Sequence, residues 1–241
     1  MKSIQLENGT WHIEGLQDWR ETYDEFCELV SEKGIDNGFK FARYGDGEFN
    51  CMQGRSGHNC DYHNYYPDLG RELLLSTISG AADRIYTGIQ PLSLSQGVYK
   101  DLIGHLFSRR HHDLVNADVF HNASITGRLG EFMDIILSRR DDVILVGNEH
   151  FEEMKAFNMS KVRWICIHRV NCWLNYHDIR RKINQFDEER HDQIFLLCAG
   201  MMSEVIIHHF AKSRNTFIDM GSVLDPYCGV KSRKYHHKLS L

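Results

Sequence analysis

Apolar residues along the chain alternate between short continuous runs and longer stretches with helical spacing. The short runs are rich in β-branched and aromatic residues, which is typical of buried strands. We predict strands at 39–44, 84–89, 118–121, 143–147, 162–167, 194–198 and 216–220. The longer stretches carry apolar residues three and four positions apart, which predicts helices. We place these helices at 17–33, 69–82, 97–108, 128–138, 151–157, 173–186 and 203–213.

Strands that alternate with helices are typical of an α/β fold, in which helices cover both faces of a mostly parallel sheet. No Pro/Gly/Ser-rich linker and no repeat of about 20–50 residues divides the chain, so we predict one Rossmann-like domain over residues 1–241. Within it we expect a helical lead-in (1–38), an α/β core (39–230) and a basic C-terminal tail (231–241). Ligands of such sheets bind at the carboxyl ends of the strands, so those ends are where we seek the chemistry.

Composition restricts the class of protein further. The chain has 28 Lys and Arg against 33 Asp and Glu, a formal net charge of -5, which argues against coating nucleic acid by charge alone. Its longest apolar run, residues 194–202, is less than half of the roughly 20 residues that a membrane span needs. The N-terminus lacks the apolar segment of a signal peptide, which predicts a cytoplasmic protein. Seven scattered cysteines without a C-x-x-C pattern then indicate reduced thiols rather than disulfides or a zinc site.

The most informative segment is Arg43-Tyr44-Gly45-Asp46-Gly47-Glu48, which directly follows a predicted strand. Asp46 and Glu48 can both turn toward one hard divalent cation, and the planar guanidinium of Arg43 suits phosphate oxygens. A cation together with an arginine stabilises the charge of a departing diphosphate. The alternative is an Asp-Gly hairpin turn with surface side chains. The glycine patterns of nucleoside triphosphatases and dinucleotide-binding proteins, and the nucleophile elbow of hydrolases, are absent from the sequence.

Five segments in the same order make the chain resemble the bacterial GT-D glycosyltransferases, which hold a divalent metal and a UDP-sugar with an Asp-x-Glu motif. The first is Arg43–Glu48, which matches R-x-G-D-G-E, and the others are residues 143–149, 171–179, 197–200 and 217–222. Residues 199–201 depart from the family because they lack its common Gly-Pro turn. The resemblance implies a GT-D-like fold in which Asp46 and Glu48 ligate Mn²⁺ or Mg²⁺ and Arg43 neutralises the diphosphate. Gly45 and Gly47 would let the backbone approach the phosphates, since they carry no Cβ.

Other predicted strand ends supply further candidates. Asn148 and Asn171 are candidates for binding uracil or ribose, although Asn171 is also placed to cap the helix that follows it. Ser222 and Arg233 are candidates for contacts with the donor, since Ser222 follows a strand and Arg233 belongs to the basic cluster at 231–238.

An inverting transferase needs a base that takes the proton of the acceptor hydroxyl. Asp225 is our first candidate and His236 our second. An aspartate before a proline also commonly accepts hydrogen bonds from the backbone of a turn, which is the alternative for Asp225. The run at 58–67 is rich in His and Tyr, so it predicts either an aromatic platform for an acceptor or a packed surface loop.

We therefore predict a metal-dependent glycosyltransferase that moves a hexose from a UDP-sugar to a hydroxyl of a glycan on a protein or lipid carrier. Transfer to a hydroxylated DNA base is an alternative, supported by the basic tail and the Tyr-rich run, but the net negative charge favours a glycan. A metal-dependent nucleotide-sugar phosphohydrolase and a non-catalytic nucleotide-binding module are further alternatives. The sequence is compatible with a monomer or a homo-oligomer.

Overall fold

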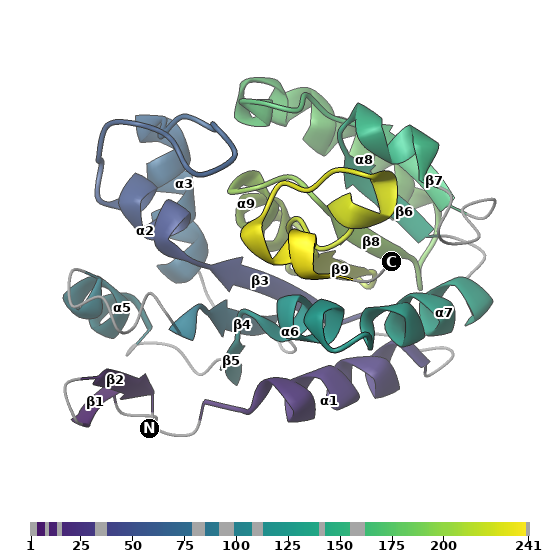
Figure 1. Cartoon of the computed structure of the whole chain (residues 1–241). Coiled ribbons are helices and arrows are strands. Elements are labelled where there is room, and N and C mark those ends of the chain that lie inside the picture. Colours follow the sequence, from purple (N-terminus) through teal and green to yellow (C-terminus); the bar gives the residue numbers. More distant parts are fainter. Residues whose placement is uncertain are drawn as a thin grey trace.

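A parallel seven-stranded sheet organises the molecule (Figure 1). The computed structural model describes residues 4–7, 10–13, 16–31, 38–78, 85–91, 99–107, 113–139, 143–154 and 162–239. The strands follow the order β5-β4-β3-β9-β8-β6-β7, and every neighbouring pair is parallel. They are β3 (Lys40–Tyr44), β4 (Ile85–Ile89), β5 (Asp113–Asn116), β6 (Val143–Gly147), β7 (Val162–Cys166), β8 (Ile194–Leu197) and β9 (Thr216–Asp219). The predicted α/β class is confirmed.

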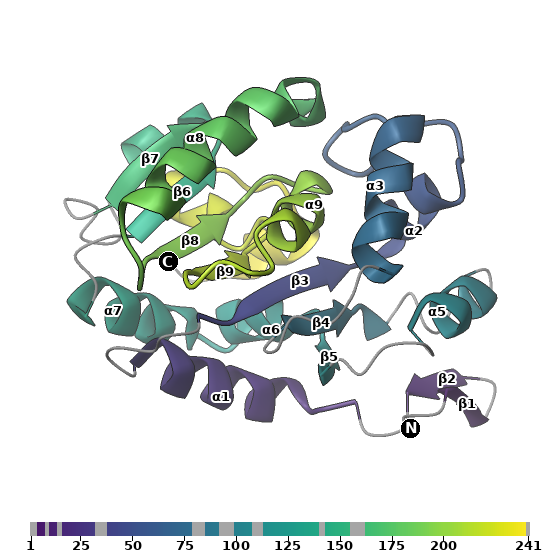
Figure 2. The ribbon, with the colours of Figure 1, turned by 180° about the vertical axis from the view of Figure 1, so that it is seen from behind.

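Helices cover both faces of the sheet, as Figures 1 and 2 show from opposite sides. One face packs against α1 (Trp19–Ser31), α6 (Val119–Ile125) and α7 (Leu129–Arg139). The other face packs against α2 (Asp46–Met52), α3 (Pro67–Ile78), α5 (Lys100–Phe107), α8 (Tyr176–Glu189) and α9 (Met202–His209).

Alternate residues of each strand enter the two cores. On β3, Phe41 packs among α1 and α6, where its ring and that of Phe26 lie 5.0 Å apart, while Ala42 and Tyr44 pack on the opposite side. Successive side chains of a strand point to opposite faces, so a strand covered on both faces must be apolar throughout. This is why the central strands could be predicted from continuous apolar runs.

One predicted strand is wrong. Asp118 is the N-cap of helix α6 and residues 119–121 are its first turn, and the neighbouring edge strand is β5, which was not predicted. Val119, Phe120 and Ala123 are fully buried on one side of α6, a spacing that suits a helix packed on the sheet. The apolar residues at 118–121 are therefore the start of a helical stripe rather than a strand.

Two other helices differ in form from the prediction. The segment predicted as a helix at 151–157 starts as a 3-10 helix, η1 (Glu149–Glu153), and its residues 155–157 lie outside the described residues. The helix predicted at 173–186 is a 3-10 turn, η3 (Cys172–Asn175), followed by α8. Parts of four further predicted elements, at 32–33, 79–82, 84, 97–98 and 108, also lie outside the described residues.

The two ends of the chain form different kinds of local structure. The predicted lead-in contains a strand pair, β1 (Ile4–Glu7) and β2 (Thr10–Ile13), in addition to its helix. The predicted basic tail contains the 3-10 helix η5 (Lys234–Lys238), which follows another, η4 (Asp225–Cys228). Among the described helices, none has the length and apolar character needed to cross a membrane.

Candidate functional site

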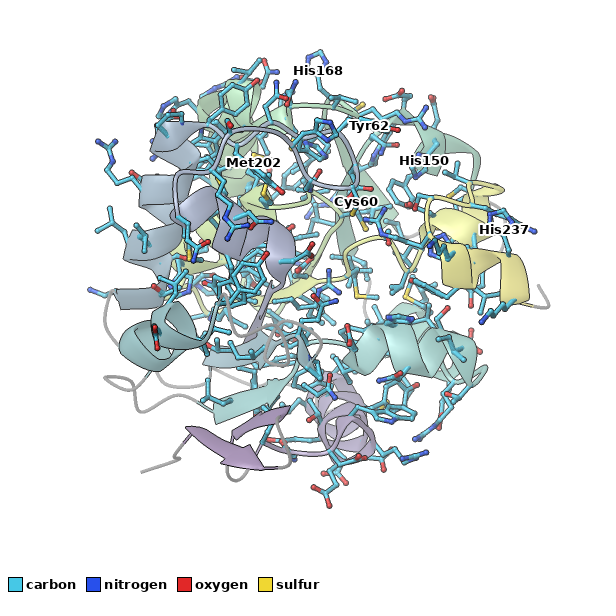
Figure 3. All side chains as sticks on the ribbon, turned by 60° about the vertical axis from the view of Figure 1, so that its left-hand side comes forward. Cys60, Tyr62, His150, His168, Met202 and His237 are labelled. Atoms are coloured by element: carbon cyan, nitrogen blue, oxygen red, sulfur yellow. The ribbon has the colours of Figure 1, made fainter. Side chains whose placement is uncertain are left out.

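A cleft of about 920 Å³ opens at the carboxyl ends of the central strands. Its lining comes from the carboxyl ends of β3, β4, β5, β6, β7, β8 and β9, from the loop at 53–66 between α2 and α3, and from the C-terminal segment at 230–239. Figure 3 shows three lining residues, Tyr62, His150 and His168, on the same side of the molecule. This is the edge at which ligands of parallel sheets bind.

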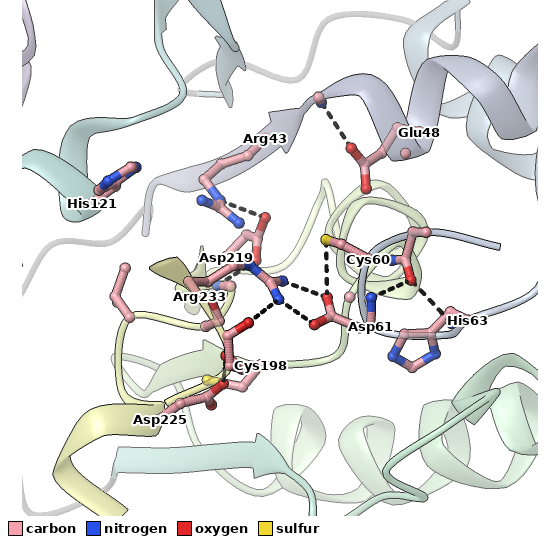
Figure 4. Close-up of a pocket in the computed structure, with 18 of the residues that line it drawn as sticks. Arg43, Glu48, Cys60, Asp61, His63, His121, Cys198, Asp219, Asp225 and Arg233 are labelled. Atoms are coloured by element: carbon pink, nitrogen blue, oxygen red, sulfur yellow. Dashed lines mark hydrogen bonds and ion pairs between the residues drawn. The ribbon is translucent and has the colours of Figure 1, made fainter. Parts of the chain in front are cut away.

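Arg43 and Asp219 form a charge pair in this cleft (Figure 4). They stand near the ends of the neighbouring strands β3 and β9, and Arg43 Nε donates to Asp219 Oδ2 at 2.8 Å. Burial lowers the pKa of Arg43, but the charge and hydrogen bond of Asp219 outweigh it, so the net shift is upward. Among the described residues, the Nη1 and Nη2 groups of Arg43 have no hydrogen-bond partner. The guanidinium is therefore fixed through Nε while its outer edge stays available to a ligand.

Gly221 makes room for this guanidinium. Its φ of +56° is left-handed, and a Cβ on it would lie 2.1 Å from Nη2 of Arg43. The backbone N–H of Gly221 also donates to Asp219 Oδ1 at 2.9 Å. Both carboxylate oxygens of Asp219 are thus occupied, which holds Arg43 in one orientation.

Asp46 and Glu48 stand in the first turn of α2, so the hairpin-turn alternative for this segment is wrong. Asp46 is exposed and Glu48 is partly buried, and both line the cleft. Glu48 Oε2 accepts a hydrogen bond from the backbone N–H of Gly45 at 2.7 Å, which caps the helix. Burial raises the pKa of Glu48 to about 7, although the bond from Gly45 lowers it.

The two glycines that flank Asp46 fit against protein groups. A Cβ on Gly45 would lie 2.9 Å from Gln90 Oε1, and one on Gly47 would lie 3.3 Å from the Cβ of Asn59. Both glycines line the cleft. The close contacts with Gln90 and Asn59 are therefore a structural reason for two small residues here, besides the approach of a phosphate.

The carboxylates of Asp46 and Glu48 fit a divalent cation that takes most of its ligands from substrate phosphates and water. Within the described ranges, no three His, Cys, Asp or Glu side chains are gathered into a ready-made metal site. Mg²⁺ is usually bound through one or two carboxylates together with substrate phosphates and water, rather than by an all-protein cage. Asp46 and Glu48 supply two oxygen donors of that kind beside Arg43. The donor set therefore suits a cation that arrives with a diphosphate.

Glu204 is a site residue that the sequence analysis missed. It lies in the first turn of α9, is 2% exposed and lines the cleft. Burial raises the pKa of Glu204 well above its ordinary range, and the charges of Glu48 and Asp219 raise it further. Its Oε2 has no hydrogen-bond partner among the described residues. A single acid in the apolar run at 201–207 is the sequence signal that could have identified it.

Asp225 also lies in the cleft, with both of its oxygens engaged. Its Oδ1 is 3.2 Å from Nε2 of His150, and its Oδ2 accepts from Oγ of Ser232 at 2.5 Å. The contact with His150, which reaches Asp225 from η1, was not predicted. The second candidate base, His236, is fully buried and does not line the cleft, so it does not face a bound acceptor.

Arg233 closes one wall of the cleft. Its Nη1 and Nη2 donate to Oδ1 and Oδ2 of Asp61, each at 2.5 Å, in a two-pronged pair between the C-terminal segment and the 53–66 loop. Arg233 was predicted to contact the UDP-sugar, but its guanidinium is already paired with Asp61. Asp61 was not predicted, because 172 positions separate it from Arg233 in the chain.

The remaining candidates divide into two groups. Asn148 and Ser222 line the cleft, and the side chain of Asn148 also accepts from the backbone N–H of His150 at 3.2 Å. Asn171 is not among the lining residues; its backbone N–H donates to His63 and its Oδ1 accepts from the backbone of Asn64. Asn171 occupies the N-cap position of η3, as the alternative predicted, but its side chain makes no cap bond. Asn171 instead supports the 53–66 loop.

That loop brings several polar and aromatic side chains to the cleft. Asn59 Oδ1 accepts from the backbone N–H groups of Asp61 and His63 at 2.9 and 3.0 Å, which fixes the loop internally. Tyr62 is 67% exposed, and its ring centroid lies 5.1 Å from that of His58. The loop is therefore ordered by its own bonds while one aromatic face remains available.

Comparison with known proteins identifies the fold. No protein-family model and no curated protein matches the chain. Solved structures do match. A protein described as domain of unknown function 1792, with a distinct glycosyltransferase fold, has a TM-score of 0.58 at 14% identity, over 86% of this chain and 83% of that one. A protein described as a new glycosyltransferase from Streptococcus sanguinis has a TM-score of 0.60 at 14% identity, over 86% and 81% of the two chains. The predicted glycosyltransferase fold is confirmed.

Proposed function

We propose that the protein is a glycosyltransferase that moves a hexose from a UDP-sugar to a hydroxyl acceptor with the help of a divalent cation. The observation that carries the proposal is the fixed guanidinium of Arg43, whose free edge faces a cleft that also contains Asp46 and Glu48. The cleft lies at the carboxyl edge of a sheet with a glycosyltransferase fold, and its volume of about 920 Å³ suits a nucleotide sugar.

The charges of the cleft support the need for a cation. The lining contains seven carboxylic acids, Asp46, Glu48, Asp61, Asp118, Glu204, Asp219 and Asp225. It contains five lysines and arginines, Arg43, Arg169, Arg233, Lys234 and Lys238, of which two are already paired with acids. Even without Glu204, whose pKa burial raises, the acids outnumber the bases, so a diphosphate meets no net positive charge here unless a divalent cation enters with it. When bound at Asp46 and Glu48, such a cation supplies positive charge to the diphosphate oxygens.

The protein's own groups can perform the remaining steps. We infer that Asp225 takes the proton of the acceptor hydroxyl as the acceptor oxygen bonds to the anomeric carbon of the sugar. The bond from that carbon to the diphosphate breaks, and its electron pair leaves with UDP. The Nη groups of Arg43 stabilise this charge, because they are already oriented by Asp219. His150 and Ser232 hold the carboxylate of Asp225 in position.

Two classes of acceptor remain candidates, and we place a glycan first. Tyr62 offers an exposed ring on which a sugar can stack, and the excess of carboxylic acids in the lining disfavours a polyanion. One observation favours a hydroxylated DNA base: the Tyr-rich loop and the basic residues Lys234 and Lys238 line the same cleft as Asp46. Both acceptors belong in the same assay.

The proposal is tested by the release of UDP. The purified protein is incubated with Mn²⁺ and a panel of UDP-hexoses, with no acceptor, with oligosaccharides or with hydroxymethylated DNA. We expect release that depends on the oligosaccharide and on Mn²⁺, and that stops in the presence of EDTA. Asp46→Ala is the matched inactive protein, because Asp46 is exposed and its loss leaves the core intact.

Other outcomes assign other functions. Formation of UMP and hexose 1-phosphate without any acceptor identifies a phosphohydrolase, and release of UDP with DNA alone identifies the second acceptor class. Tight binding of UDP without turnover on any acceptor identifies a nucleotide-binding module. Absence of UDP binding in the presence of Mn²⁺ contradicts the donor site itself.

A further inference from the structure

The cleft contains one acidic side chain that the proposed mechanism does not use. Glu204 is 2% exposed, and its Oε2 has no hydrogen-bond partner among the described residues. The residues beside it on α9 are fully or almost fully buried and apolar, among them Met202, Val205 and Ile206. Nothing in this apolar surrounding satisfies the Oε2 atom.

An oxygen of this kind is costly to the folded protein. Buried polar side chains almost always have a hydrogen-bond partner, because each loses its bonds to water on burial. The neighbouring acids of the cleft do have partners. Asp219 is bonded to Arg43 and to the N–H of Gly221, and Glu48 accepts from the N–H of Gly45. Among the described acids that line the cleft, Glu204 is the one with a buried oxygen that has no partner.

The position of Glu204 narrows the identity of a ligand for this oxygen. Glu204 lines the same cleft as Arg43, Glu48 and Asp219, which mark the end of the cleft where we place the diphosphate. A carboxyl group accepts hydrogen bonds when ionised and both donates and accepts when protonated, so a hydroxyl group suits it in either state, whereas a phosphate oxygen, which only accepts, suits it in one. The hexose of a nucleotide sugar is joined directly to the diphosphate, and its hydroxyl groups both donate and accept hydrogen bonds. A carboxyl group can bind two neighbouring hydroxyls at once.

We propose that Glu204 binds hydroxyl groups of the transferred hexose and thereby selects among UDP-sugars. The inference rests on the proposed function, because it requires the donor to be a nucleotide sugar bound at Arg43. The buried position strengthens selection: a hexose that lacks the matching hydroxyl leaves the carboxyl group unpaired, and the site rejects it strongly.

The test compares sugar and nucleotide binding in the same protein. The dissociation constants of UDP, of the tightest-binding UDP-hexose and of its monodeoxy analogues are measured by calorimetry with Mn²⁺ for the wild type, Glu204→Gln and Glu204→Ala. We expect Glu204→Ala to weaken the UDP-hexose by about 10- to 100-fold and UDP by less than about twofold. For Glu204→Gln we expect a smaller loss. In the wild type, one monodeoxy analogue should bind as weakly as the hexose binds to Glu204→Ala.

Controls separate recognition of the sugar from a structural role. Glu152→Gln removes an exposed acid outside the cleft lining and should change neither constant. Glu204→Gln should melt at the same temperature as the wild type or higher, because it removes a buried carboxyl that has no partner for Oε2. A variant that melts lower and binds UDP and the UDP-hexose equally weakly would show that Glu204 only supports the structure.

The two proposals fail in different ways. If the wild type binds UDP-hexoses and the Glu204 variants bind them equally well, this inference is overturned and the proposed function is unaffected. If the wild type binds neither UDP nor UDP-hexoses, the proposed function is overturned, and this inference with it.

Discussion

Strand β3 carries two cations, the buried Lys40 and the partly buried Arg43, whose surroundings differ completely. Lys40, at its amino end, is 2% exposed, and its Nζ donates to the backbone carbonyls of Gly38, at 2.9 Å, and Ser213. Arg43, three residues later at the carboxyl end, uses its Nε for Asp219, while its two Nη groups have no partner among the described residues. One cation is satisfied by the protein and the other is held ready for a ligand.

Other buried polar groups at the two ends of the sheet differ in the same way: those at the amino end have partners within the protein, and one at the carboxyl end has none among the described residues. At the amino end, the fully buried Asn215 accepts from the N–H of Gln193 and donates to the side chain of Asp187 and the carbonyl of Arg190, at 2.8 to 2.9 Å. At the carboxyl end, the buried Oε2 of Glu204 has no partner in the described part of the chain. The amino edge of the sheet therefore contributes stability, and the carboxyl edge gives up part of that stability to keep binding groups unsatisfied.

The largest effect that we expect is a loss of turnover when the acids at the carboxyl edge are removed. We expect Asp46→Ala, and equally Glu48→Ala, to reduce UDP release by at least about 10²–10³-fold, because the diphosphate would lose the charge that offsets its own. The far-UV circular dichroism of Asp46→Ala should remain native. Unchanged activity in both variants would show that the carboxyl edge is not the donor site.

A second substitution tests the guanidinium of Arg43. Arg43→Lys keeps the charge, but its compact ammonium group lacks the planar fork that bonds Asp219 through Nε and leaves both Nη groups for a diphosphate. We expect UDP release to fall by about 10–10²-fold, since the loss corresponds to one or two hydrogen bonds to a charged group. Steady-state kinetics with a UDP-hexose checks this, and Lys182→Arg, on the surface of α8, is a control for the exchange of the two cations.

At the amino edge we expect the opposite result. Asn215→Ala leaves the N–H of Gln193 without its acceptor and should lower the free energy of unfolding by about 2–3 kcal/mol, measured in urea. Asn184→Ala, which removes a single bond to Glu188 on the surface of α8, should cost less than about 0.5 kcal/mol. Both folded variants should release UDP at the wild-type rate. Lower activity in folded Asn215→Ala would contradict the claim that the amino edge contributes only to stability.

A pair of glycines sharpens the comparison. Gly221 and Gly229 both have positive φ, +56° and +77°, so alanine strains both by about 1 kcal/mol. Only at Gly221 would the new Cβ overlap Arg43; nothing lies within 4 Å of the Cβ position at Gly229. We expect similar losses of stability but a loss of activity of about tenfold or more in Gly221→Ala alone. Equal activity of the two variants would mean that the orientation of Arg43 does not matter.

The smallest expected effect is a dependence of stability on pH. Burial lowers the pKa of His236 from 6.5 to about 4, and the ring is neutral in the folded protein because its Nδ1 accepts from the N–H of Arg233. The unfolded chain therefore binds a proton first, and stability present above pH 6.5 is lost as the pH falls toward 4. The contribution is at most about 1.4 kcal/mol per pH unit. His236→Gln should flatten this part of the profile relative to the exposed His237→Gln.

Much of the fold was predictable because the central strands are covered on both faces. Strands β6 and β8 have only buried residues, so they read as continuous apolar runs. The edge strand β5, Asp113-Leu114-Val115-Asn116, is short and has polar residues at both ends, so it carries too weak a signal. Helix α2 was not predicted, because its first turn contains Gly47; burial of Phe49 and Met52 outweighs the poor helix propensity of glycine.

The candidate site was predictable only where its residues are local in sequence. Arg43, Asp46 and Glu48 fall within one short segment after a strand, and the structure places all three in one cleft. The pairs of Asp61 with Arg233 and of His150 with Asp225 join residues 172 and 75 positions apart. No local pattern predicts such contacts, since they depend on how the strand ends come together in space.

The place of β9 between β3 and β8 sets an order of events during folding. β9 is the last strand of the sheet along the chain, and it alone connects the half β5-β4-β3 to the half β8-β6-β7. A nascent chain that ends before residue 216 therefore leaves two half-sheets with open edges at β3 and β8, which are exposed to wrong pairing. Asp219 arrives on this same strand, so the step that joins the halves also gives Arg43 its partner.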